Sequence, residues 1–400
     1  MDVTAARQAM KVLLEPYAGN RDKTAREEAL QVLRSINDLE ALQELIQVYP
    51  KLLTLESPSE GLCPPLVEAV KRGRLEIIRA LLKHRVTMPP EQLVPPLYHQ
   101  YEDNGFRGHW GTPLTTACML GRHDIVRMLS DGTPDVDINE VDYDGYTPFL
   151  SAARGIADET EAQTRDRLAI LRLLMDRGAD VHAVKADSLR NSETLDKEFD
   201  EGLVHRPFVF RPRPGGLGNA LSLAMEVVEL NTSILQFLVK EAGVNVFKAS
   251  LRTWSAYQHF AYDHAFITPL GVGARYGNIK GVETLLSLFP DAEDHIRLLA
   301  TTDATIVPEP RPAQQSPEDE MPVLFPLHAA LLGKQKFRAP WGADDVLTTN
   351  ETIRAATINA AYRQHYTPLH MVTSFDRIPL LLEVVKLGAD LDTPAWMATD

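Results

Sequence analysis

Residues 111–132 have the sequence GTPLTTACMLGRHDIVRMLSDG, and this stretch decides the fold. Thr112 is a residue type that caps helix N-termini, and Pro113 suits the first helical position because its φ is already close to helical. Gly121 follows where a left-handed residue would end a first helix. Residues 125–129 then supply the apolar face of a second helix. The stretch therefore predicts a helix, a tight turn and a second helix.

The same phrase recurs along the chain, which predicts a repeat array rather than a single compact core. Thr-Pro followed by an apolar residue returns at 147–149, 268–270 and 367–369, and weaker copies begin at Pro64, Asn219 and Phe325. Small residues follow in each clear copy, so neighbouring first helices are expected to stack closely. Gly-Ala-Asp ends the second helix of two copies, at 178–180 and 388–390.

This pattern resembles the ankyrin repeat. The Thr-Pro-Leu-His phrase of that family is intact at 367–370, and its Asp-x-x-Gly-x-Thr-Pro connection is intact at 142–148. The resemblance implies an all-α fold, an ankyrin-repeat solenoid of about eight helix-turn-helix repeats with extended finger insertions. It also assigns His328 and His370 to the scaffold, as the family's structural histidine. Stacked repeats form an extended concave surface, so the resemblance implies binding to other proteins.

Repeats and insertions divide the chain into six segments. These are a degenerate N-terminal helical cap (1–63), ankyrin repeats (64–182), an insertion containing Arg, Pro and Phe (183–218), repeats with an aromatic insertion at 247–266 (219–299), a Pro-rich acidic flexible loop (300–323) and C-terminal repeats (324–400). Insertions in successive repeats line up on one side of a solenoid, so we expect them to wall in the concave face.

Composition and charge exclude several classes of function. Of the 400 residues, 44% are hydrophobic and 24% are charged, which is typical of a folded soluble protein. The net charge of −14 repels phosphate backbones and argues against direct binding to nucleic acid. Cys63 and Cys118 are too few for a disulfide framework and are expected to be buried thiols. We expect a cytoplasmic or nuclear protein that does not contact membranes.

The insertions hold the candidate residues for binding a partner or ligand. They are Tyr101, His109, Trp110, Arg206, Arg211, Arg213, Trp254, Tyr257 and His259. Aromatic and Arg side chains dominate the energy of protein interfaces, and Arg also binds carboxylates and phosphates. The alternative interpretation is structural, since a Trp can anchor each insertion on the array and the Phe208–Phe210 pair can dock the Arg-rich loop.

Residues 251–263 are predicted to form a helix that docks Trp254 and Tyr257 on the array. His259 and Asp263 would then be neighbours on another face, but two such groups so close in sequence rarely form a zinc site. The glycines of GVGARYG (271–277) follow an expected helix start, so they do not form a phosphate-binding loop after a strand. We therefore expect no cofactor and no metal.

Two classes of function remain. The leading one is a non-catalytic scaffold that binds a protein partner on the concave and finger face, as a regulatory adaptor or co-regulator. The alternative is a small-ligand-binding protein or an atypical enzyme with a pocket built from the insertions, which their His, Tyr, Trp and Arg content motivates. The sequence carries no recognisable catalytic motif, which favours the scaffold.

Two further expectations concern the array itself. Leu285 is expected in the core, on the apolar face of a second helix. The sequence after the last repeat, LGADLDTPAWMATD (387–400), offers little to cover its outer side. Either Trp396 folds back over that side, or a partner or further sequence covers it.

Overall fold

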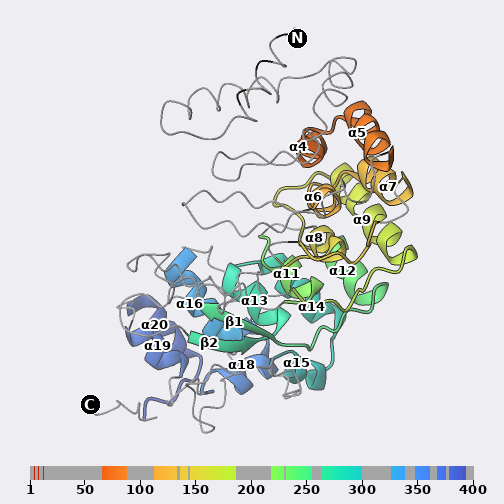
Figure 1. Ribbon diagram of the computed structural model, residues 1–400. Helices are drawn as coiled ribbons and strands as arrows, with labels where there is room; N and C mark the ends of the chain where they lie inside the picture. Colours follow the sequence, from red (N-terminus) through yellow and green to blue (C-terminus); the bar gives the residue numbers. More distant parts are fainter. Residues whose placement is uncertain are drawn as a thin grey trace, which may run out of the picture.

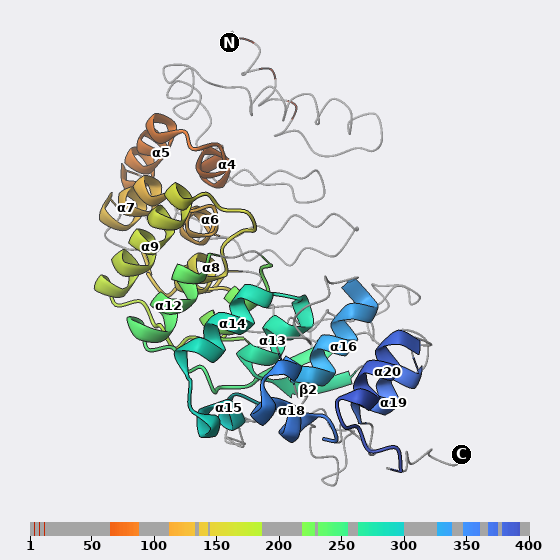
Figure 2. The same ribbon diagram turned by 180° about the vertical axis from the view of Figure 1, so that it is seen from behind.

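The chain is a curved stack of helix pairs, seen from two sides in Figures 1 and 2. The computed structural model describes residues 65–87, 112–132, 136–142, 145–185, 218–228, 231–254, 263–299, 326–337, 347–360, 367–374 and 378–392, with the single positions Thr4, Gln8 and Val12. The all-α repeat solenoid predicted from the sequence is confirmed. The expected first repeat lies outside the described residues.

The helices form two rows. The first helices of the repeats are α4 (Pro65–Arg72), α6 (Pro113–Met119), α8 (Pro148–Arg154), α11 (Ala220–Met225), α13 (Pro269–Tyr276), α16 (Pro326–Phe337) and α19 (Pro368–Ser374), and each packs on the next. The second helices that pack on them are α5 (Leu75–Thr87), α7 (His123–Gly132), α9 (Glu161–Asp176), α12 (Thr232–Lys240), α14 (Ile279–Leu288) and α20 (Ile378–Lys386). From α4 to α13 the first helices line the inner side of the bend (Figure 1).

Three elements depart from this pattern. A two-stranded antiparallel hairpin, β1 (Ser250–Trp254) with β2 (Asp263–Ile267), precedes α13. Two further helices, α15 (Ala292–Leu299) and α18 (Glu351–Thr357), pack against each other. The rest of the described chain alternates between first and second helices, except that no second helix is described for α16.

The helix starts follow the local chemistry predicted from Thr-Pro. Thr112, Thr147 and Thr268 each accept a hydrogen bond from a backbone N–H three residues on, at 3.1, 3.2 and 3.3 Å. At the last repeat, Thr367 Oγ1 lies 2.8 Å from Nδ1 of His370 within the same helical turn. Gly121 and Gly277, which were predicted to end the first helix of their repeats, have positive φ values of +66° and +74°.

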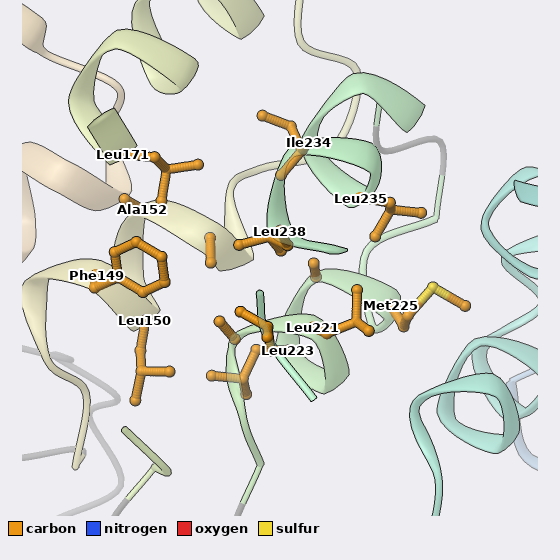
Figure 3. Packing of buried hydrophobic residues seen from close by; sticks show 14 of the residues in the cluster. Phe149, Leu150, Ala152, Leu171, Leu221, Leu223, Met225, Ile234, Leu235 and Leu238 are labelled. Carbon is orange, nitrogen blue, oxygen red and sulfur yellow. The ribbon is translucent and has the colours of Figure 1, made fainter. Parts of the chain in front are cut away.

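The core lies between successive layers, so each first helix is buried on several sides. Figure 3 shows side chains of α8, α9, α11 and α12 meeting in one layer. Among them are Phe149, Leu171, Leu221 and Leu238, whose exposed fractions are all 0%. A β-carbon at Gly273 would collide with the Met225 methyl on α11, so this glycine lets α13 approach α11 closely.

Buried apolar residues form two clusters. The main one runs from α4 to α18 and also includes Met371 of α19, and the second joins α16 to the last helix pair through residues such as Leu327, Leu331, Leu369 and Val384. α16 belongs to both, because its residues 329–330 lie in the main cluster. The buried position predicted for Leu285 is confirmed.

Cys118 also lies in the core. Burial raises the pKa of its thiol well above the usual range, partly offset by the positive charge of Arg167. The thiol therefore stays protonated at neutral pH, and its position agrees with the expected buried thiol. Cys63 lies outside the described residues.

A buried guanidinium joins three helices at the centre of the stack. Arg167 of α9 donates from Nη1 to the carbonyl oxygens of Cys118 (3.1 Å) and Ala152 (3.0 Å), and from Nη2 to that of Met119 (3.1 Å). Its Nε donates to both carboxylate oxygens of Glu159 at 2.7 and 2.9 Å, and Nη2 also pairs with Glu159. Both side chains are almost completely buried. Arg167 thus adds donors to carbonyls in the last turn of α6, where the helix itself leaves carbonyl oxygens without their usual partners.

A second Arg–carboxylate pair lies on the outer surface. Arg172 of α9 donates to Glu241, which follows α12, at 2.9 and 3.1 Å, and these hydrogen bonds hold the pKa of Glu241 below its usual 4.5. A carboxyl group with a lowered folded-state pKa adds stability above its unfolded-state pKa and loses it as the pH falls through the folded value. The pair is exposed, so its contribution is screened by salt.

We therefore expect Arg172→Gln to reduce the acid sensitivity of the protein slightly. Thermal denaturation of both proteins at about pH 6 and about pH 3.5 in low salt tests this, because the first pH lies above and the second below the ordinary pKa of a Glu carboxyl group in an unfolded chain. The wild type should lose more of its melting temperature than the variant. Equal losses would contradict a stabilising role for the pair.

Candidate functional site

The connections between repeats are held in register by asparagine side chains. Asn139 donates from Nδ2 to the Gly178 carbonyl (3.2 Å) and accepts at Oδ1 from the Asp180 N–H (2.7 Å), which ties one connection to the next. Asn359 makes the same pair of bonds to Gly388 (3.3 Å) and Asp390 (2.8 Å). We call the side of the array formed by residues 136–142, 145–147, 177–185 and 241–250 the finger edge.

The large insertion at 183–218 leaves from this edge and returns to it. Val184 and Asn219 form an antiparallel bridge, and the Lys185 N–H donates to the Gly218 carbonyl at 2.8 Å. Asn219 also donates from Nδ2 to the carbonyl of Asn245 in the next connection, at 2.9 Å. The two ends of residues 186–217 therefore lie side by side, next to the base of the following finger.

That following finger is a β-hairpin, so the predicted helix over 251–263 is wrong. Ser250 pairs with Ile267 at its base and Trp254 with Asp263 at its outer end. The base is fixed by a 3.1 Å contact between the hydroxyls of Ser222 and Ser250. Asp263 lies in a strand, which removes the expected helical i, i+4 neighbourhood with His259. Residues 255–262 join the two strands.

A cation–aromatic group lies where the finger edge meets the inner helices. The Tyr146 ring centroid is 4.7 Å from Lys185 Nζ and 5.7 Å from Arg154 Cζ. Arg154, at the end of α8, lies 3.9 Å from the carboxylate of Glu226, which follows α11. Tyr146 is held by the turn before it, because its N–H donates to Asp142 Oδ1 at 2.8 Å. Two successive repeats and the connection between them thus contribute to one polar group.

Most of the predicted site residues lie outside the described residues. These are Tyr101, His109, Trp110, Arg206, Arg211, Arg213, Tyr257 and His259; for Trp254 the structure describes the backbone alone. The described bases show that the insertions carrying the three Arg residues and Tyr257 leave from adjacent connections. The sequence analysis missed Tyr146, Arg154 and Lys185. Arg154 lies seven residues after the helix cap Thr147, and Glu226 lies seven residues after the helix cap Asn219. Aligning the repeats on their caps would therefore have shown that these two residues occupy equivalent positions in successive repeats.

Two searches of the described part of the chain were negative. Within it, no group of three His, Cys, Asp or Glu side chains is arranged to hold a metal ion. No described helix is both long enough and apolar enough to cross a bilayer. The glycines of GVGARYG lie inside or at the end of α13, as predicted, and not in a strand-to-helix loop.

Stacked helix pairs with hydrogen-bonded connections define a helical-repeat solenoid. Residues 114–155, which run from α6 through α8, match the family model described as ankyrin repeats in many copies. The chain therefore contains ankyrin repeats. Among solved structures it is similar to the crystal structure of the human ASB11 ankyrin repeat domain, at 15% identity and a TM-score of 0.44, over 82% of this chain and 99% of that one. No curated protein matches the sequence.

Proposed function

We propose that this protein is a non-catalytic scaffold that binds a protein partner along the finger edge and the adjoining concave face. It would act as a regulatory adaptor or co-regulator in the cytoplasm or nucleus. Ankyrin repeats are generally protein–protein interaction modules. The observation that carries the proposal is the alignment of the connections, because the hydrogen bonds of Asn139 and Asn219 bring the bases of successive fingers together on one edge.

The chemistry of this edge suits a protein surface. Tyr146, Arg154 and Lys185 offer an aromatic face and two cations beside the insertion that contains Arg206, Arg211 and Arg213. Tyr and Arg are enriched among residues that dominate binding energy. Glu226 lies beside Arg154, so the group presents both a positive and a negative charge. A partner with complementary charges would therefore bind in one preferred orientation.

Site-specific photo-crosslinking in source-cell extract tests the proposal. A photoreactive amino acid replaces Lys185 on the finger edge, and in a control protein it replaces Arg79, which is exposed on the outer helix α5. We expect a discrete protein adduct from position 185 and none from position 79. The adduct should disappear in a folded Tyr101→Ala, His109→Ala, Tyr257→Ala, His259→Ala variant.

An adduct of the same protein from position 79 alone would contradict the proposed face. The absence of any protein adduct would favour the alternative, a small-ligand-binding protein or atypical enzyme. That alternative relies on His109 and His259, which lie outside the described residues.

A further inference from the structure

Two cations lie beside one aromatic ring along α8. Tyr146 comes just before this helix and Arg154 ends it, and the Tyr146 ring centroid lies 5.7 Å from Arg154 Cζ. Lys185, from the following connection, places Nζ 4.7 Å from the same centroid. The Arg154 side chain is 41% exposed, and Tyr146 and Lys185 are half-buried. Solvent, and therefore a partner, can reach this group.

The Arg154 guanidinium has hydrogen-bonding capacity to spare. Its Nε is shielded from solvent and has no hydrogen-bond partner among the described residues. A carboxylate oxygen of Glu226 lies 3.9 Å from that Nε, which gives a charge attraction but is too long for a hydrogen bond. A guanidinium carries five N–H donors in a fork that matches a carboxylate. Arg154 can therefore accept a second carboxylate on its exposed side.

Charges at equivalent positions of neighbouring repeats also favour an anion here. Arg154, Glu226 and Arg275 each lie seven residues after the cap of their first helix, and α8, α11 and α13 pack side by side (Figure 1). Arg275 is buried, so it contributes charge rather than contact. This row is positive overall and Lys185 adds to it, although the whole chain carries −14. Such a local reversal of sign selects for a negatively charged group.

The acidic side chains of the adjoining finger edge are bound to their own turns. Asp142 accepts from the Tyr146 N–H at 2.8 Å, and Asp180 accepts from the His182 N–H at 2.9 Å. In the part of the chain that the structure describes, Glu226 is the one carboxylate paired with Arg154. The exposed side of this guanidinium is therefore open to a carboxylate from another molecule.

We propose that the protein partner binds here through an acidic segment, with an Asp or Glu carboxylate on the exposed side of the Arg154 guanidinium and Lys185 as the second cation. This inference rests on the proposed scaffold function and gives the chemistry of the partner. The Tyr146 ring attracts both cations and so holds two like charges near each other. A bound carboxylate relieves the repulsion between them.

Fluorescence anisotropy with two labelled peptides tests this inference on the full chain. The probes are a Glu–Gly repeat peptide and a neutral Gln–Gly repeat peptide of the same length, in low salt. We expect the wild type to bind the Glu–Gly peptide and not the Gln–Gly peptide. Arg154→Gln combined with Lys185→Gln should weaken binding by about tenfold or more, because charge-assisted contacts are lost.

A matched double variant separates this group from the general charge of the protein. Arg79→Gln with Arg165→Gln removes the same charge from exposed sites on the outer helices α5 and α9, and it should leave binding unchanged. Glu226→Gln should strengthen binding by roughly twofold to fivefold, because it removes the carboxylate that competes for Arg154. A gain in affinity cannot result from a variant that fails to fold.

Three outcomes would overturn the acidic segment. They are no binding of the Glu–Gly peptide, equal losses in the two double variants, and binding that Glu226→Gln leaves unchanged or weakens. A protein adduct from position 185 together with any of these would keep the scaffold function and remove only the acidic partner. The crosslinking protein retains Arg154, the main contact, so loss of Lys185 in that protein does not abolish the site.

Discussion

Arg167→Met is expected to lower the free energy of unfolding by about 3–5 kcal/mol, because it leaves the buried Glu159 carboxylate without its partner. The substitution also removes the donors to the carbonyl oxygens of Cys118, Met119 and Ala152. Urea denaturation followed by circular dichroism measures the loss. Methionine keeps the approximate length of the side chain, so the effect reports the lost charge and hydrogen bonds more than a cavity.

Arg165→Met supplies the matched control, since Arg165 is an exposed residue of the same helix. An exposed substitution away from special features should change stability by no more than about 0.5 kcal/mol. Adding Glu159→Leu to Arg167→Met should recover part of the loss by removing the unpaired carboxylate. Equal effects of Arg167→Met and Arg165→Met would show that the buried pair does not hold the layers together.

Leu285→Ala is expected to cost about 2–5 kcal/mol, because it removes a fully buried side chain between two repeats and leaves a cavity. The measurement is again urea denaturation, with Ser287→Ala on the exposed side of α14 as the control. A loss below about 0.5 kcal/mol would be that of a surface position and would contradict the packing of α14.

The repeat fold was predictable because its signals are local. The Thr112 side chain caps the start of a short helix, and Gly121 ends it by adopting a positive φ. The same local chemistry recurs in each clear copy of the repeat. The hairpin was not predictable in this way. The short segment after Ser250, Leu-Arg-Thr-Trp, suits either a helix face or a strand, and its pairing with β2 is decided by contacts beyond the local sequence.

The buried ion pair left a weaker trace in the sequence. Arg167 falls on the stripe that Thr164, Leu171 and Leu174 bury on α9, so a charged residue in a core position was visible. Its partner was not, because Glu159 reaches it from a loop with the unusual positive φ of 58° at Asp158. The finger edge was missed for a similar reason, since Tyr146 and Lys185 meet only when neighbouring repeats are stacked.

The division of the apolar core into two clusters has a consequence for how the molecule opens. Each layer touches only its neighbours, so the resistance to local unfolding varies along the array. Among the described first helices, α16 contributes residues 327 and 331 to the second cluster and 329–330 to the main one, and α19 reaches the main cluster through Met371 alone. Loosening at α16 would let the C-terminal end swing as a hinged unit while the central layers stay closed. The width of the concave opening would then change at its C-terminal end, while the hydrogen bonds from Arg167 to the carbonyls of α6 and α8 stay intact.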